Sequence, residues 1–280
     1  MNRKTLERIF LEIISEDEGF SDITSSNIPS KVINARIISH SYGYVSGIKE
    51  LRVLFDLFKI SVLRSKSDGD YIRKGTVVFR LRGNTKDILL VERTALNLIS
   101  RMSGITTLTR EYVDFCKKIN PKVKIAITRK TTPLFRYFEK EAVKIGGGDT
   151  HRFGLYDMVL IKDNHLKLFD SIKKCITAIK AKKSFVHKIE IEVKNQKEAL
   201  EAMMCSVDII MFDNMLPSEI KLVMSKIKKQ YPNTNTLFEA SGNINLENIK
   251  EYLMSGVDVI SVGRLTHTIP ILDFNLSIDT

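Results

Sequence analysis

Residues 188–214 read KIEIEVKNQKEALEAMMCSVDIIMFDN and contain a unit that recurs along the chain. The runs KIEIEV and DIIMFD are β-prone and mostly apolar, and a segment of helical character joins them. Each run carries a carboxylate near its end, Glu192 in the first and Asp213 in the second. Strands that alternate with helices form parallel sheets. The stretch therefore predicts a βαβ unit with acidic side chains at the carboxyl ends of its strands.

Four more runs of this kind follow Pro121. In chain order, the six runs are VKIAIT (123–128), MVLIKD (158–163), KIEIEV (188–193), DIIMFD (208–213), TLFEAS (236–241) and VISVGR (259–264). This alternation predicts an α/β fold with a closed or nearly closed barrel, whose active site lies at the carboxyl ends of the strands. We therefore expect one mouth that gathers Thr128, Arg129, Lys162, Asp163, Glu192, Asp213, Glu239, Ser241 and Gly263.

The first third of the chain has a different texture. Leu6, Ile9, Phe10, Ile13 and Ile14 are spaced as one apolar stripe of a helix. Residues 32–82 contain short β-prone runs with glycine turns, which indicate a small α+β or mainly β unit. Residues 91–119 have a long helical pattern, with Gly104 as a predicted interruption between two pieces.

Composition limits the classes of function. The 280 residues, of 32.0 kDa, are 43% hydrophobic and 28% charged, which is typical of a globular protein of one or two domains. The sequence contains no uncharged apolar run long enough to span a membrane, and the first ten residues lack the apolar core of a signal peptide. Three widely separated cysteines offer neither a disulfide framework nor a zinc site. We expect a cytoplasmic protein that does not bind membranes.

The net charge of +11 indicates an acidic partner, which could be a nucleic acid, a membrane surface or an anionic small molecule. Many lysines lie in stretches such as LVMSKIKKQY, where they are expected to face solvent on one side of a helix. A nucleic-acid-binding protein would interleave basic and aromatic residues on an exposed face, and no such interleaving is present. It remains a remote alternative.

Within the predicted mouth, the charges separate into two sets. Glu192 and Asp213 are acidic and suit ribose hydroxyls, a hydrated Mg²⁺ or a developing positive charge. Like charges about 4 Å apart repel by roughly 4 kcal/mol at an effective dielectric near 20, so a basic cluster implies a bound anion. The basic set is Arg129, Lys130, His151, Arg152 and Lys162.

Three groups of small residues mark places where backbone can approach a ligand closely. Residues 146–148 are glycines directly before His151, and the stretches SGN (241–243) and SVGR (261–264) come late in the barrel, where phosphate sites are common. They predict a carboxylate-binding pole early in the barrel and a phosphate pole late. Glu190, two residues before Glu192, is expected on the other face of its strand, with a structural role.

Several long blocks of the chain resemble quinolinate phosphoribosyltransferase, also called nicotinate-nucleotide pyrophosphorylase (carboxylating). The resemblance runs from residue 16 to residue 278. The blocks, in order, are EDEGFSDIT, ERTALNLISRMSGI, TRKTTP, GGGDTHRFGLYDMVLIKDNH, IEIEV, IIMFDN, EASGNI, SVGRLTH and LTHTIPILDFNLSI.

The resemblance implies an N-terminal α/β sandwich, residues 1–104 completed by 270–280, and an open, TIM-like α/β barrel, residues 105–269. It implies a homodimer or an assembly of dimers. It also implies a reaction in NAD biosynthesis, in which quinolinate and phosphoribosyl pyrophosphate give nicotinate mononucleotide, pyrophosphate and CO₂ with Mg²⁺ as cofactor.

The resemblance also assigns roles to residues. Lys130, Lys162, Glu192 and Asp213 would be catalytic, with Glu192 and Asp213 as candidate Mg²⁺ ligands. Arg93 would reach the site of a neighbouring subunit. The residues expected to bind substrate are Arg93, Thr128, Arg129, His151, Arg152, Ser241, Gly242, Asn243, Ser261, Val262 and Gly263.

The chain departs from the family pattern at four positions. Ile127 replaces an Asp, Thr150 an Asn, Asn243 a glycine and Arg264 a small residue. Ile127 and Thr150 flank the basic cluster and bear on the choice of pyridine substrate. The alternative is a relative of the same fold that acts on nicotinate or another aromatic acid, including the molybdenum-associated homologues. Those homologues replace the threonines after TRK, whereas 131 and 132 are both threonine here.

Overall fold

The computed structural model describes residues 1–279, which form two compact units. Unit 1 contains Met1–Arg110, Pro133–Gly147 and Thr268–Thr280, and unit 2 contains Glu111–Thr132 and Gly148–His267. Residues 133–147, which the family resemblance places in the barrel, belong to unit 1. The two units are described separately below.

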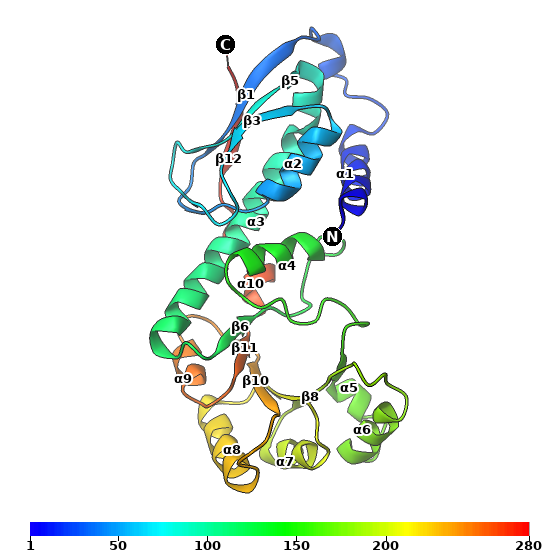
Figure 1. Cartoon of the computed structure of the whole chain (residues 1–280), viewed down its shortest axis with the longest axis vertical. Helices are drawn as coiled ribbons and strands as arrows, with labels where there is room; N and C mark the ends of the chain where they lie inside the picture. Colours follow the sequence, from blue (N-terminus) through cyan, green and yellow to red (C-terminus); the bar gives the residue numbers. More distant parts are fainter. Residues whose placement is uncertain (280) are drawn as a thin grey trace. The chain divides into compact units, whose positions relative to one another are not determined.

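Unit 1 is built on an antiparallel sheet of four strands in the order β12-β1-β5-β3 (Figure 1). Its edge strand β12 comes from the far end of the chain and pairs with β1, with Ala35 opposite Ile278. Helix α2 packs on the sheet. The ring of Phe55 in α2 meets that of Phe79 in β5 edge to face, with centroids 5.2 Å apart. The strands are β1 (Val32–Ser39), β2 (Gly43–Tyr44), β3 (Ser61–Ser65), β4 (Tyr71–Ile72), β5 (Val77–Asn84) and β12 (Phe274–Ile278).

The helices of unit 1 follow the apolar patterns of the sequence. The predicted first helix is confirmed as α1, which begins after the N-cap Asn2 and buries Leu6, Phe10 and Ile14. Phe10 contacts Phe138 of α4, with ring centroids 6.0 Å apart. The helical elements of this unit are α1 (Arg3–Glu18), η1 (Ser25–Asn27), α2 (Ile48–Leu57), α4 (Arg136–Ile145) and most of α3 (Thr85–Ile119).

Helix α3 is continuous, so the predicted interruption at Gly104 is wrong. Glycine is needed at this position for another reason. A Cβ at this position would lie 2.1 Å from the carbonyl oxygen of Pro270, in the segment that leads to β12. Gly104 therefore permits a close approach of two backbones that are distant in sequence.

Unit 2 is a parallel sheet flanked by helices, and all six predicted strands are confirmed. The spatial order is β6-β11-β10-β9-β8-β7, which leaves β6 and β7 at the edges of an open barrel-like sheet. One face of the sheet is apolar, with Phe212 stacked on Phe238 at 6.2 Å. The strands are β6 (Lys124–Ala126), β7 (Val159–Ile161), β8 (Ile189–Val193), β9 (Ile209–Asp213), β10 (Leu237–Ser241) and β11 (Val259–Ser261).

The helices of unit 2 follow their strands along the chain (Figure 1). Lys226, Lys228 and Lys229 of α8 are exposed, as the lysine pattern predicts. No helix in residues 1–279 is long and apolar enough to span a membrane. The helices are α5 (Asp163–Leu166), α6 (Ile172–Lys180), α7 (Gln196–Met204), α8 (Pro217–Gln230), α9 (Ile249–Leu253) and α10 (Arg264–His267).

The segment that carries His151 and Arg152 starts along the open edge of this sheet. Asp149 forms a parallel bridge with Ala126, and its amide donates to the carbonyl of Ile125 at 2.7 Å. The amide of Ile127 donates to the carbonyl of Asp149 at 3.1 Å. The chain then crosses from β6 towards β7, the opposite edge strand.

We predict that Gly104→Ala destabilises the protein. Alanine favours an ordinary helix by about 1 kcal/mol over glycine, but the clash with the Pro270 carbonyl forces a backbone shift that costs about 1–3 kcal/mol. Urea unfolding followed by circular dichroism measures the change. Asn97→Ala, an exposed position in the same helix, is the control and should be neutral or slightly stabilising. Equal stability of Gly104→Ala and the wild type would disprove the close-approach explanation.

Candidate active site

The carboxyl ends of the six parallel strands bring most of the predicted residues to one edge of unit 2. Ser241 lies opposite both Ser261 and Asp213, and Ile161 lies opposite Ile191, so that Lys162 and Glu192 are level. In spatial order, the ends carry Thr128 and Arg129 after β6, Ser261, Val262 and Gly263 at β11, Ser241, Gly242 and Asn243 at β10, Asp213 at β9, Glu192 at β8 and Lys162 after β7.

Lys162 and Glu192 form an ion pair across β7 and β8, with Nζ 2.5 Å from Oε1. The Lys162 side chain is 44% exposed, whereas that of Glu192 is 13% exposed. The lysine thus reaches the open side of the edge while its charge is matched by a carboxylate. An anionic ligand at this edge would compete with Glu192 for the ammonium group.

Arg129 and Arg152 form the basic centre of the site. Arg152 is 8% exposed, and its Nη1 donates to the carbonyl of Met158 at 3.3 Å. Burial lowers the pKa of Arg152, repulsion from Arg129 lowers it further, and the charges of Glu190 and Glu192 oppose both effects. The Nε of Arg129 is buried and has no hydrogen-bond partner within residues 1–279. An unpaired buried donor beside a second guanidinium is suited to receive an anion.

Lys130 lies beside Gly263, which follows β11 at the same edge. A Cβ at Gly263 would lie 3.4 Å from the Lys130 side chain and 3.3 Å from that of His267, so glycine leaves room for both. The carbonyl of Lys130 accepts from the Thr266 hydroxyl at 2.7 Å, and its amide donates to the Thr128 hydroxyl at 3.1 Å. The turn after β6 is therefore held against the turn after β11.

The turns after β9 and β10 are also joined. Gly242 has a φ of 107°, and a Cβ there would lie 2.3 Å from Oδ1 of Asn214. Asn243 has a φ of 49°, a left-handed conformation that Asn tolerates better than most residues. Its side chain donates to the same Asn214 oxygen at 3.3 Å. The replacement of a family glycine by Asn243 is thus accommodated by its backbone conformation.

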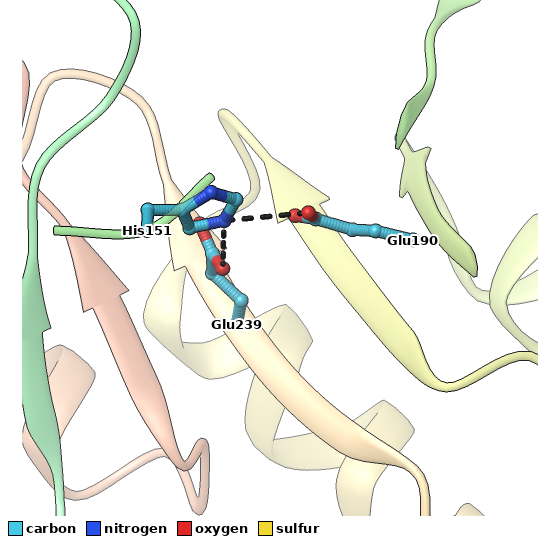
Figure 2. Close-up of side chains that lie close together, drawn as sticks. All are labelled: His151, Glu190 and Glu239. Carbon is cyan, nitrogen blue, oxygen red and sulfur yellow. Dashed lines mark hydrogen bonds and ion pairs between the residues drawn. The ribbon is translucent and has the colours of Figure 1, made fainter. Parts of the chain in front are cut away.

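His151 turns into the interior of the sheet, where it lies between two buried carboxylates (Figure 2). Its Nε2 is 3.3 Å from Oε2 of Glu190 on β8 and 3.2 Å from Oε2 of Glu239 on β10. Nδ1 accepts from the backbone amide of Arg152 at 2.7 Å. His151 also adopts a left-handed φ of 50°, which is strained for a residue with a side chain.

Burial and mutual charge interactions shift the pKa values of His151 and Glu190. Burial lowers the pKa of His151, but the two carboxylates outweigh this effect and raise the pKa to about 10. Burial also raises the pKa of Glu190, with His151 opposing the change and Glu239 reinforcing it. An N–H donor cannot meet a protonated nitrogen, so Nδ1 carries no proton in this conformation. The ring proton therefore lies on Nε2, where it faces Glu190 and Glu239.

The prediction that Glu190 faces away from Glu192 is wrong. Successive side chains of a strand alternate between its faces, so residues two apart share a face. Glu190 is fully buried in the interior with Glu239, which is 1% exposed. The period-two pattern of IEIEV contained this information, and the same pattern in TLFEAS places Glu239 and Ser241 on one face.

The remaining predicted residues differ in exposure. Asp213 is half-buried, and its Oδ1 accepts from the Asn214 side chain at 2.9 Å. Ser261 is buried, and its hydroxyl has no partner within residues 1–279. Val262 is fully buried and its amide donates to the Ala126 carbonyl, so neither its side chain nor its amide is open to a ligand. Ile127 is also fully buried, as a core residue.

Arg93 belongs to unit 1, whereas all the other predicted site residues belong to unit 2. It is exposed on α3 and borders a cavity of about 620 Å³. The cavity is lined by residues of α1, by Leu98 of α3 and by Leu134. The structure of unit 2 thus contains a basic site without Arg93.

Comparisons with known proteins cover almost the whole chain. The family described as quinolinate phosphoribosyl transferase, N-terminal domain, matches residues 22–103. The corresponding C-terminal domain matches residues 105–277.

Individual relatives agree with these matches. A probable nicotinate-nucleotide pyrophosphorylase [carboxylating] from Archaeoglobus fulgidus is 43% identical over 259 residues, which cover 92% of this chain and 98% of the relative. The protein of that name from Rattus norvegicus is 32% identical and covers 93% of this chain and 85% of its own. The structure of the nicotinate-nucleotide pyrophosphorylase from Francisella tularensis superposes with a TM-score of 0.89 at 32% identity, covering 100% of this chain and 98% of that one. The chain therefore belongs to the quinolinate phosphoribosyltransferase family.

Proposed function

We propose that this chain transfers the phosphoribosyl group of phosphoribosyl pyrophosphate to quinolinate and releases CO₂. The products are nicotinate mononucleotide and pyrophosphate. The relatives named nicotinate-nucleotide pyrophosphorylase [carboxylating] support this activity. One structural observation carries it: the buried, unpaired Nε of Arg129 lies in the same site as the guanidinium of Arg152.

This pair of guanidiniums suits a substrate with two neighbouring carboxylates. Quinolinate has carboxylates on adjacent ring carbons, and bidentate guanidinium–carboxylate bonds fix orientation as well as charge. Binding relieves the repulsion between Arg129 and Arg152. We propose that these two residues and Lys162 hold the acid so that its ring nitrogen faces the sugar, because orientation supplies much of the rate enhancement in such a transfer.

The reaction then needs no nucleophile from the protein. The ring nitrogen forms a bond to the anomeric carbon, and the bond from that carbon to pyrophosphate breaks. The adjacent carboxylate then leaves as CO₂, and the electron pair of the broken bond stays on the ring carbon as a carbanion that the positive nitrogen stabilises. A proton binds to that carbon and takes up the pair. We propose that Lys130 and the turns at Ser241–Asn243 and Ser261–Gly263 receive the phosphates, whose charge a lysine and close backbone can match.

We propose Mg²⁺ as the cofactor. Asp213 and Glu192 are carboxylates on the adjacent strands β9 and β8, and oxygen ligands are what Mg²⁺ prefers. Glu192 already pairs with Lys162, so it is not free to bind the ion alone. This arrangement fits Mg²⁺, which keeps much of its water and would be held largely by the substrate phosphates. When bound, the ion neutralises charge on the departing pyrophosphate. Asp213 and Glu192 would also accept hydrogen bonds from ribose hydroxyls.

We also propose a homodimer, or an assembly of dimers, in which Arg93 of the partner subunit completes each site. Arg93 is exposed in unit 1, and a third cation would suit two multiply anionic substrates. A cytoplasmic location is proposed as well. Cys116, Cys175 and Cys205 are all free thiols in the structure, which fits a reducing compartment.

We predict that quinolinate gives CO₂ and nicotinate mononucleotide in equal amounts, and that nicotinate is a poor substrate. Nicotinate lacks one carboxylate, so a buried cation would lose its partner, which lowers kcat/KM by about 100-fold. Mass spectrometry of the products and release of labelled CO₂ measure both. Turnover of nicotinate at the same rate as quinolinate would contradict the assignment.

We predict that Lys162→Met lowers kcat/KM by about 100-fold with little effect on stability. The ion pair with Glu192 is partly exposed, and such pairs contribute at most about 1 kcal/mol. Steady-state kinetics and thermal melting measure the two effects. Lys167→Met, which removes an exposed lysine 4.0 Å from Asp163, is the control. Normal turnover combined with a large fall in Tm would show that Lys162 is structural.

We predict that Arg93→Ala and Lys162→Met each have little activity alone and that their mixture is more active than either parent. One site of a mixed dimer then combines an intact Lys162 with the partner's intact Arg93. The assay is activity against mixing ratio at fixed total concentration, with native mass spectrometry to confirm mixed dimers. If mixed dimers form and activity stays at the level of the parents, the shared site is wrong.

A further inference from the structure

His151, Glu190 and Glu239 form a cluster below the strand ends, and the two glutamates have no role in the substrate binding proposed above. His151 borders a cavity of about 650 Å³ together with Glu239, Arg152 and residues at the amino ends of the strands. One interpretation is a metal site, because the three ligand atoms lie within 4.8 Å of one another. A histidine with two carboxylates is a common ligand set for divalent ions.

The geometry at Nδ1 argues against a metal ion. A metal bound at Nε2 needs the lone pair of that nitrogen, and the other nitrogen then normally carries the proton and donates it. Here Nδ1 accepts from the amide of Arg152 at 2.7 Å, so it has no proton to donate. With both nitrogens used as acceptors, the ring would be an imidazolate. The observed contacts instead require a proton on Nε2, directed at the two carboxylates.

Both nitrogens of His151 are therefore committed within the protein. Nε2 faces Glu190 and Glu239, Nδ1 faces the Arg152 amide, and the side chain is only 12% exposed. In this conformation the ring has no nitrogen left for a substrate carboxylate. These contacts favour a role for His151 that acts through its neighbour in the chain.

We propose that Glu190 and Glu239 are positioning residues, which hold the His151 ring so that it fixes the backbone, and hence the guanidinium direction, of Arg152. The contacts form a continuous path. β8 and β10 supply the two carboxylates, the ring links them to the Arg152 amide, and the Arg152 side chain donates to the Met158 carbonyl.

The backbone at His151 explains why such an anchor is needed. The left-handed φ of 50° disfavours any residue with a Cβ, and the loop spans the open edge between β6 and β7. The amide of His151 donates to Oδ1 of Asp149 at 2.8 Å, which ties one side of the loop to β6 through the Ala126 bridge. The ring ties the other side to the interior. Without the His151 ring, the guanidinium group of Arg152 would point in several directions.

The test compares variants that keep or remove an acceptor for Nε2–H. Glu239→Gln retains an oxygen at the same place, whereas Glu239→Leu removes it without a large change in volume. We expect Glu239→Leu to raise the KM for quinolinate at least tenfold with the KM for phosphoribosyl pyrophosphate changed less than twofold, and Glu239→Gln to recover to within threefold of the wild type. Glu247→Leu, at an exposed glutamate of unit 2, is the matched control.

A second measurement does not depend on the proposed function, on which the kinetic test rests. Hydrogen exchange of the free protein should be faster at residues 148–158 in Glu239→Leu, with the strands of the sheet unchanged, and normal in Glu239→Gln. If the wild type does not act on quinolinate, the proposed function fails, and exchange alone then decides whether Glu239 holds the loop. If exchange and the KM for quinolinate both stay normal in Glu239→Leu, the positioning role is wrong.

Two further results would also overturn the proposal. Equal loss of activity in Glu239→Gln and Glu239→Leu, with a stoichiometric metal ion found in the wild type and absent from both, would establish a metal site. Faster exchange over the whole sheet, with both KM values and kcat altered together, would establish a purely structural role. Should Glu239→Leu not fold, His151→Gly removes the ring while glycine accepts the left-handed φ, and the same selective rise in KM and loop exchange is expected.

Discussion

The repulsion between the guanidinium groups of Arg129 and Arg152 is the constraint on which the proposed substrate site of unit 2 depends. Two like charges in a partly buried site are tolerated only if nearby groups offset them until an anion arrives. The offset comes from the interior, where the charges of Glu190 and Glu192 stabilise the charged form of Arg152. These charges allow the two cations to lie in one site, and a dianionic acid would replace part of this internal compensation.

The parallel sheet provides this compensation through its register. Residues two apart on one strand share a face, so Glu190 lies in the interior while Glu192 reaches the edge and pairs with Lys162. Strand β8 thereby contributes to two layers of charged residues, a lower layer with Glu190 and an upper layer with Glu192. The lower layer holds the loop that carries Arg152, and the upper layer lies where substrates would bind. This division explains why an edge made of short strands can hold a loop that crosses its open side.

Backbone conformation serves the site as much as side-chain chemistry does. Gly242, Asn243 and Asn214 all have positive φ values and join the turns after β9 and β10. Gly263 leaves space for Lys130, and the Thr266 hydroxyl binds the Lys130 carbonyl. The turns that we propose to receive phosphates are thus held against one another, whereas the loop that we propose to receive carboxylates is held from below. The two poles expected from the sequence differ in how they are supported.

The sequence by itself determined the six strands and the residues at their ends, because apolar runs that alternate with helices have a local signature. It also contained the period-two signal that places Glu190 beside Glu239, although our interpretation of Glu190 missed it. Only the tertiary structure decided that β6 pairs with β11, that Gly104 faces Pro270, and that His151 meets carboxylates from β8 and β10. These contacts join segments tens of residues apart. They depend on which surfaces exclude water together and which buried polar groups find partners, and a local pattern does not encode that choice.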